Sequence, residues 1–392
     1  MVYNDGLGMR FVGEYIRGVV VKLHLTLEQE VLFKQNYGCT RKTHNELLNK
    51  YKAKYDGDSN KIPTKTELNQ FLNESKKELP YLMETESTSL QQARDDLHKA
   101  FKNSFKSKRH NPPKFHSKKK TRPSFRQTIR KDKRPVEKNT LTLRKHGKVT
   151  FSTSVEYLDL LNSPDTKFNN ITVYYDGLNH YASFNIKTQP PEQLPLTEEH
   201  IGWDINSNKN GWLVTSEGQK EFFDVDHDNQ MIKHINRLMS KCRNMSRRWK
   251  KLQKRLQKWY NKRTNQLNDY IEKLTYNLVK KYDTIVFEEN YSTIKILIGG
   301  EQNMIFPLSR FIKRLKDKFQ LYKPEADGVQ FVKPHNTSRT CHHCGHINKE
   351  LKVKTRNWKC QKCGKILDRD TNAAINILNR WFNGDSLKKY LN

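Results

Sequence analysis

The chain has 392 residues, with 73 Lys and Arg against 42 Asp and Glu, a formal net charge of +31. This length suits two or three domains, and such an excess of positive charge favours a polyanion as partner, above all nucleic acid. An aromatic content of 10% excludes a disordered basic tail. No apolar run is as long as a membrane span, and the first residues lack the apolar core of a signal peptide, so we predict a cytoplasmic protein without a membrane partner.

The first half of the chain has the pattern of a β-barrel interrupted by helices. Thr26 and Gln29 predict a capping box at the start of a helix, and Asp176 with Gly177 predicts the turn of a hairpin. Residue patterning predicts the remaining elements, with strands over 17–25, 139–151 and 169–186 and helices over 64–79 and 87–105.

Residues 106–134 form a basic segment in which 13 of 29 residues are Lys or Arg. Phe115 and Phe125 are interleaved with the cations. Because phosphates attract Lys and Arg while rings stack on bases, this pattern favours nucleic-acid contact over a solvated loop, which remains the alternative. The predicted contacts are Lys106, Lys108, Arg109, Lys114, Lys118, Lys119, Lys120, Arg122 and Arg126.

The second half begins after a proline-rich stretch, 187–199, which we interpret as a domain linker. The order of elements that follows, three strands, helix, strand, helix, strand, helix, is typical of an RNase H-like fold. The expected strands are 201–205, 211–215, 221–225, 284–289 and 328–334, and the expected helices run from about 230 to 282, over 307–323 and over 370–382.

Within the long helix, residues 241–263 hold 11 cations and no acid. Trp249 and Leu256 fall on one face of this helix, and a row of cations falls on another. A solvated face normally mixes charge signs, so we predict that this row contacts nucleic acid. The row consists of Arg247, Lys251, Lys254, Lys258 and Lys262.

Four of the six cysteines have the spacing of a metal site. Cys341 and Cys344 form one Cys-x-x-Cys pair, and Cys360 and Cys363 form a second pair after 15 intervening residues. Two such pairs predict a zinc ribbon that holds one structural Zn²⁺, with Gly345 and Gly364 supplying the turns. A site with four protein ligands is closed and does not catalyse.

Three carboxylates lie at the ends of predicted elements: Asp204 and Glu288 at strand ends, and Asp370 at the start of the last helix. An acid in an apolar strand is costly unless it is paired or bound to metal. In an RNase H-like arrangement these acids would hold a pair of Mg²⁺ ions for phosphodiester hydrolysis. Turn-capping, surface and helix-capping roles remain the alternatives for the single residues.

Several motifs resemble the TnpB family of transposon-encoded RNA-guided DNA endonucleases, relatives of the compact type V CRISPR effectors. They are residues 26–48, which look like that family's helical entry motif, residues 90–115, and the signatures around the two cysteine pairs, 336–346 and 360–378. The resemblance implies an RuvC-like nuclease with Asp204, Glu288 and Asp370 as catalytic metal ligands. It implies cleavage of both strands of target DNA, chosen by a guide RNA from the transposon end and by a short target-adjacent motif.

The resemblance also implies an α+β multidomain fold with an N-terminal wedge-type β-barrel, an inserted helical recognition bundle and an RuvC-like nuclease domain with an inserted zinc ribbon. We expect the barrel over 1–35 and 131–190, the recognition domain over 36–130, the nuclease domain over 191–335 and 367–392, and the ribbon over 336–366. One protein is expected per RNA. The alternatives are a compact type V CRISPR effector, an RNA-guided DNA-binding repressor without cleavage, and a DNA-strand transposase.

Overall fold

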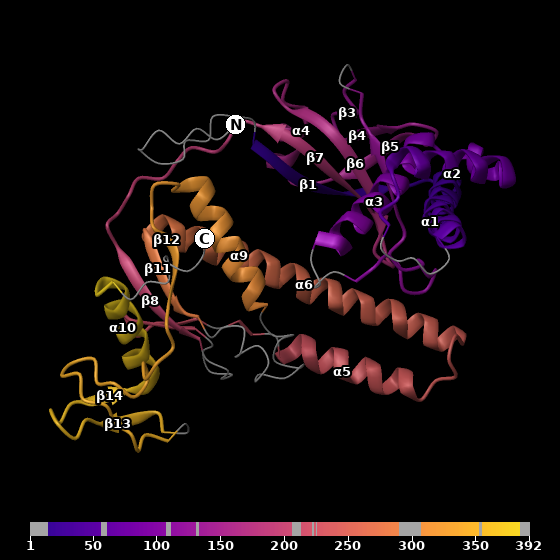
Figure 1. Cartoon of the computed structure of the whole chain (residues 1–392). Helices are drawn as coiled ribbons and strands as arrows, with labels where there is room; N and C mark the ends of the chain where they lie inside the picture. Colours follow the sequence, from indigo (N-terminus) through magenta and orange to yellow (C-terminus); the bar gives the residue numbers. More distant parts are fainter. Residues whose placement is uncertain are drawn as a thin grey trace. The chain divides into compact units, whose positions relative to one another are not determined.

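The computed structural model describes residues 15–55, 61–106, 111–130, 133–205, 213–221, 223–224, 226–289, 307–352 and 355–384. The chain divides into two compact units, an N-terminal unit that extends to residue 189 and a C-terminal unit that begins at residue 190 (Figure 1). No helix in the described ranges combines the length and the apolar character needed to span a bilayer.

The N-terminal unit is built on a seven-stranded antiparallel sheet with the order β2-β6-β7-β1-β5-β4-β3. Its long central strands alternate between buried and exposed residues, as expected for a sheet with one face on the core. The hairpin predicted about Asp176 and Gly177 is confirmed, since it joins β6 to β7. The strands are β1 (Tyr15–His24), β2 (Ser124–Thr128), β3 (Val136–Glu137), β4 (Thr140–Leu143), β5 (Gly147–Ser152), β6 (Lys167–Tyr175) and β7 (His180–Thr188).

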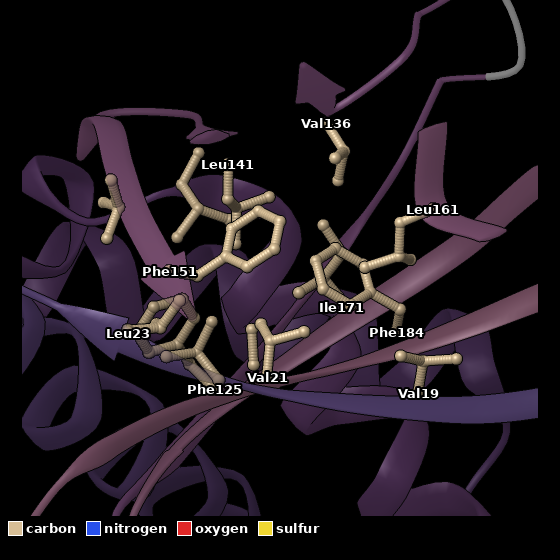
Figure 2. Close-up of a cluster of buried hydrophobic side chains, with 14 of the residues drawn as sticks. Val19, Val21, Leu23, Phe125, Val136, Leu141, Phe151, Leu161, Ile171 and Phe184 are labelled. Atoms are coloured by element: carbon tan, nitrogen blue, oxygen red, sulfur yellow. The ribbon is translucent and has the colours of Figure 1, made fainter. Parts of the chain in front are cut away.

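Alternate residues of these strands point into one apolar core. Figure 2 shows Val19 and Val21 of β1 gathered with Phe151 of β5 and Phe184 of β7 in this cluster. Helix α1 contributes Phe33 to the same cluster. The sheet and the start of α1 therefore share a single hydrophobic core.

Four α-helices and a short 3₁₀ turn complete the described part of this unit: α1 (Leu27–Tyr55), α2 (Lys65–Glu78), η1 (Pro80–Glu84), α3 (Ser87–Lys106) and, before β6, α4 (Val155–Asn162). The capping box at α1 is confirmed, because the Gln29 amide donates to Thr26 Oγ1 at 3.2 Å and the Thr26 amide donates to Gln29 Oε1 at 3.1 Å. The apolar stripe of α3 packs on α1 and α2, except that Phe105 is 41% exposed.

The basic segment 106–134, for which the sequence favours nucleic-acid contact over a solvated loop, is in part packed into the N-terminal unit. It contains β2, where Phe125 is 2% exposed and packs edge-on against Phe33 with ring centroids 5.6 Å apart. Phe125 is therefore a core residue and cannot stack on a base. The alternation that buries Phe125 and Gln127 and turns Arg126 outward is hidden in the sequence by the surrounding charges. Earlier in the segment, the Asn45 side chain of α1 donates to the His116 carbonyl and accepts from the His116 amide.

The C-terminal unit contains a five-stranded sheet with the order β10-β9-β8-β11-β12. Strand β9 is antiparallel to β8 and β10, whereas β11 is parallel to both β8 and β12. Apart from a second helix in the stretch from about 230 to 282 and a short two-stranded hairpin before the last helix, the order of strands and helices is the predicted one. The elements are β8 (His200–Ile205), β9 (Leu213–Thr215), β10 (Lys220–Glu221), α5 (Asp226–Ser240), α6 (Arg247–Lys281), β11 (Thr284–Glu288), α9 (Leu308–Tyr322), β12 (Gly328–Val332) and α10 (Arg369–Phe382).

The single helix predicted from about 230 to 282 is wrong, because α5 and α6 are two helices that pack against each other (Figure 1). Helix α5 ends at Ser240, and Met245 in the connection to α6 adopts a positive φ of 64°. The Ser246 side chain caps α6 by accepting from the Trp249 amide at 3.2 Å. The cation-rich start of α6 therefore follows directly on the turn that joins the two helices.

The proline-rich segment 187–199 does not behave as a free linker. Its first two residues belong to β7, and its end is bound to the C-terminal unit. There, the Thr197 and Glu198 amides each donate to the Asp283 carboxylate at 2.7 Å. The side chain of Lys323, which is fully buried, donates to the same carboxylate at 2.7 Å. A buried ion pair with satisfied hydrogen bonds therefore anchors the first residues of the C-terminal unit.

Candidate metal centres and nucleic-acid contacts

The three predicted acids come from three elements of the C-terminal unit. In the parallel pairing of β8 with β11, Trp203 lies opposite Phe287, so Asp204 and Glu288 follow at the same end of neighbouring strands. Asp370 is the second residue of α10, whose first turn is capped by Asp368. The fold therefore directs all three carboxylates to one region.

Helix α10 reaches this region because β8 has a glycine where the helix crosses it. A Cβ on Gly202 would lie 2.2 Å from the Ala374 carbonyl oxygen and 2.9 Å from Leu378. The backbone of β8 and the backbone of α10 are therefore in direct contact, an approach that only glycine permits. This contact sets the distance between α10, which carries Asp370, and β8, which carries Asp204.

The electrostatics of the three acids are those of a crowded site. Glu288 and Asp370 are buried, and Asp204 is half-buried. Burial raises the pKa of Asp204 well above its ordinary value, and repulsion from Glu288 and Asp370 raises that pKa further. Arg369 and Arg356 oppose this shift in the pKa only in part. Such mutual repulsion between carboxylates is relieved when a divalent cation binds between them.

Two residues that the sequence reasoning missed hold these acids in place. Arg356 Nη1 donates to both oxygens of Asp370, at 3.1 and 2.8 Å, and Thr337 donates its hydroxyl proton to Glu288. Thr337 falls in one of the family-like motifs, but its role there was not assigned. Arg356 lies between the two cysteine pairs among several cations, so spacing alone did not distinguish it.

Two asparagines of α10 tie the acid region to the first cysteine pair. Asn372 accepts from the His342 amide at 2.9 Å and donates to the Thr340 carbonyl at 2.8 Å. Asn376 donates to the Thr337 carbonyl at 2.8 Å. The segment that carries Thr337 is thus anchored on α10, which also carries Asp370.

The four cysteines converge as their spacing predicts. Their sulfur atoms all lie within 4.8 Å of one another, the single such group of metal-ligating side chains among the described residues. The Sγ atoms of Cys341 and Cys363 are 3.7 Å apart, and those of Cys344 and Cys360 are 3.6 Å apart. A tetrahedron with Zn–S bonds of about 2.3 Å has edges of about 3.8 Å, so the donor set fits zinc.

The two cysteine turns are built alike. Gly345 and Gly364 both have a φ of 72°, and each donates its amide to the carbonyl of the first cysteine of its pair at 2.9 Å. The hairpin of β13 (Asn357–Lys359) and β14 (Ile366–Asp368) brings the second pair round. Backbone amides of Cys363 and Lys362 lower the pKa of Cys360 to about 6, whereas burial and hydrogen bonds with the other three cysteines raise the pKa of Cys344 to about 12.

Most of the predicted nucleic-acid contacts are exposed cations. Lys108 and Arg109 lie outside the described residues. Arg126 is bound by both oxygens of Asp96 at 2.9 Å, and Lys262 pairs with Asp228 at 3.2 Å, so these two have partners within the protein. The other members are exposed: Lys106, Lys114, Lys118, Lys119, Lys120, Arg122, Arg247, Lys251, Lys254 and Lys258.

Comparison with known proteins identifies the family. A model described as "Cas12f1-like, TNB domain" matches residues 309–377, and one described as "Probable transposase" matches residues 183–294. A Streptomyces pristinaespiralis protein named as a candidate RNA-guided DNA endonuclease is 27% identical over 92% of this chain and 88% of its own length. InsQ of Escherichia coli K12, described in the same way, is 24% identical over 90% and 89%. The chain belongs to the TnpB family.

The TnpB fold of this chain also resembles a solved CRISPR effector. The protein in the structure of a Cas12f1–sgRNA–target DNA complex aligns with a TM-score of 0.56 at 14% identity, covering 93% of this chain and 99% of that one. The two proteins therefore share an α+β fold over nearly their whole lengths, despite little remaining sequence identity.

Proposed function

We propose that this TnpB protein is an insertion-sequence-encoded, RNA-guided DNA endonuclease. It binds a guide RNA derived from the transposon end, recognises a short target-adjacent motif and cleaves both strands of DNA by RuvC-type hydrolysis. Relatives that align over nearly their full lengths carry the name RNA-guided DNA endonuclease, which supports this assignment.

The observation that carries the proposal is the convergence of Asp204, Glu288 and Asp370. Burial, and then repulsion from Glu288 and Asp370, raise the pKa of Asp204, and a divalent cation would relieve that repulsion. These three carboxylates would hold the Mg²⁺ ions, which would activate water for attack on the scissile phosphodiester and stabilise its leaving group. Thr337 orients Glu288, and Arg356 orients Asp370 and adds positive charge beside the phosphate.

The proposed division of labour follows the two units. The N-terminal unit corresponds to the wedge barrel, 1–35 and 131–190, with the recognition helices of 36–130, and it grips the guide RNA. The C-terminal unit corresponds to the RuvC-like domain, 191–335 and 367–392, with the zinc ribbon of 336–366. Sequence is read by pairing between RNA and DNA, while cations of both units contact the backbone.

A plasmid-library cleavage assay tests the nuclease. Purified protein with its bound RNA should linearise target plasmids in Mg²⁺, and Asp204→Ala should abolish cleavage while guided binding persists. Glu288→Gln and Glu289→Gln form a matched pair, because Glu289 is the exposed neighbour of the buried acid. Cleavage at the wild-type rate by Asp204→Ala or Glu288→Gln would refute the site, and guided binding without cleavage in the wild type would indicate a repressor.

Sequencing the copurified RNA tests the guide. We expect RNA from the 3′ end of the gene and the adjoining transposon end. RNA made from CRISPR repeats would instead indicate an array-dependent effector, and strand-transfer products without RNA would indicate a transposase.

A further inference from the structure

The outer face of the N-terminal sheet carries a stack of planar side chains. The guanidinium carbon of Arg122 lies 3.3 Å from the centroid of the Tyr174 ring. Tyr174 of β6 lies opposite Tyr181 of β7, and their rings stack with centroids 5.4 Å apart and planes inclined by 23°. The Arg122 guanidinium and the rings of Tyr174 and Tyr181 therefore form a stack in the protein without a ligand.

This stack faces away from the core. The neighbours of the two tyrosines along their strands, Val173 and Ala182, belong to the apolar core, so Tyr174 and Tyr181 point to the opposite face. Both rings are half-buried, whereas Arg122 is exposed. The plane of Arg122 that does not contact Tyr174 is thus open to a further planar group.

Positive charge continues from the stack along the sheet. In the strand register, Tyr181 lies opposite Lys22 of β1, and Lys22 lies opposite Ser152 of β5. Lys22 is exposed, and His24 Nε2 is 3.0 Å from Ser152 Oγ. A nucleic-acid strand with one base stacked on Arg122 could therefore place a phosphate near Lys22 on β1.

The rows beside the stack carry short polar side chains. Thr172 lies opposite Ser183, and Asn170 lies opposite Asn185, on the same outer face. Hydroxyl and amide groups at this spacing can exchange hydrogen bonds with a ribose 2′-hydroxyl, the group that distinguishes RNA from DNA. Outward-facing Gly18 continues the second row on β1 and leaves room for a chain to approach.

We propose that this face, defined by Arg122, Tyr174, Tyr181 and Lys22, binds an unpaired segment of the guide RNA, with one base stacked on Arg122. Stacking on aromatic and guanidinium planes needs a base that is free of its own helix, which excludes a regular duplex as the occupant. The inference rests on the proposed function only for the source of the RNA.

Photo-crosslinking locates the RNA. The full-length protein is irradiated with a short oligouridine that carries 4-thiouridine, and crosslinked peptides are identified by mass spectrometry. We expect crosslinks in the peptides that contain Arg122, Tyr174 or Tyr181. Crosslinks found only in other peptides would overturn the proposal.

Substitutions separate stacking from charge. Arg122→Lys keeps the charge and removes the plane, and it should weaken oligouridine binding about tenfold at salt that suppresses phosphate contacts. Gly18→Glu adds a negative side chain whose Cβ meets no atom closer than 4.0 Å, so binding should weaken while the melting temperature stays unchanged. Wild-type affinity of Arg122→Lys would contradict the proposal.

The same binding measurement with DNA tests whether this face prefers RNA. Oligodeoxyuridine of equal length should bind more weakly and should be less sensitive to Arg122→Lys. Equal affinity and equal sensitivity would overturn the assignment to RNA. None of these measurements involves cleavage, so a protein that crosslinks here and does not cut plasmids would refute the endonuclease alone.

Discussion

Gly202 shows how one residue places the acid region. Because a Cβ there would lie 2.2 Å from the Ala374 carbonyl oxygen, we expect Gly202→Ala to lower the free energy of unfolding by about 1–3 kcal/mol and to reduce cleavage by displacing α10 and Asp370. Thermal denaturation and plasmid cleavage measure the two effects.

Gly18→Ala is the matched control, a glycine in a strand whose added Cβ would meet nothing closer than 4.0 Å. We expect this variant to unfold at the wild-type temperature. If Gly202→Ala proved as stable and as active as Gly18→Ala, the close approach of β8 and α10 would not be what positions Asp370.

Residues with a strong local signal could be predicted from the sequence. The four cysteines are defined by their own spacing, Asp204 and Glu288 by the apolar strands that they end, and Asp370 by its place at the start of the last helix. Arg356 and Thr337 could not be predicted in this way, because each acts on a carboxylate that only the tertiary fold brings near. The burial of Phe125 could not be predicted either, because the charged residues around it in the sequence point away from the core that buries its ring.

At the scale of single elements, strands were recognised by alternation and α1 by its cap. The hairpin of α5 and α6 was missed because residues 241–246 contain no Pro or Gly to interrupt the helical pattern. The break depends on the positive φ of Met245 and on the Ser246 cap, neither of which residue periodicity reveals.

The exposed cations of α6 should bind RNA through its phosphates. We expect the triple replacement of Lys251, Lys254 and Lys258 by Ala to weaken RNA binding and to reduce the slope of log affinity against log salt by about 2. Filter binding over a salt series measures this slope. Lys273→Ala removes an exposed cation that pairs with Asp269 on the same helix, and it should leave the slope unchanged.

The docking of the basic segment on α1 should depend on pH. His44 and His116 stack with centroids 3.7 Å apart, and burial and the neighbouring His116 lower the pKa of His44 to about 4. Burial and Arg41 also lower the pKa of His116. The stabilising contribution of neutral His44 is therefore complete above its ordinary pKa of about 6.5 and is lost as the pH falls towards 4.

Amide hydrogen exchange of residues 114–116, corrected for intrinsic rates, should therefore accelerate as the pH falls from about 6.5 to 4. His44→Phe keeps an aromatic ring and removes its titration, so it should reduce this acceleration. Equal acceleration in both proteins would show that His44 does not govern the docking.

For the molecule as a whole, most of the element order and the local hairpin of β6 and β7 could be predicted, but the pairing of strands distant in sequence could not. The order of elements indicated the C-terminal fold. The place of β2 at the edge of the N-terminal sheet depends on its pairing with β6. The paired residues lie 42 to 50 positions apart in the sequence, from Thr128 with Asn170 to Ser124 with Tyr174. Contacts over such distances leave no local pattern in the chain.

The net charge of +31 leads to a prediction for the whole molecule. Without RNA, the cations repel one another, so added salt should raise the melting temperature by screening that repulsion. With RNA bound, the polyanion stabilises the folded state by mass action, and salt weakens this binding. Differential scanning fluorimetry over a salt series should therefore give slopes of opposite sign for the two forms. A melting temperature that falls equally with salt in both forms would mean that the excess charge is already balanced within the protein.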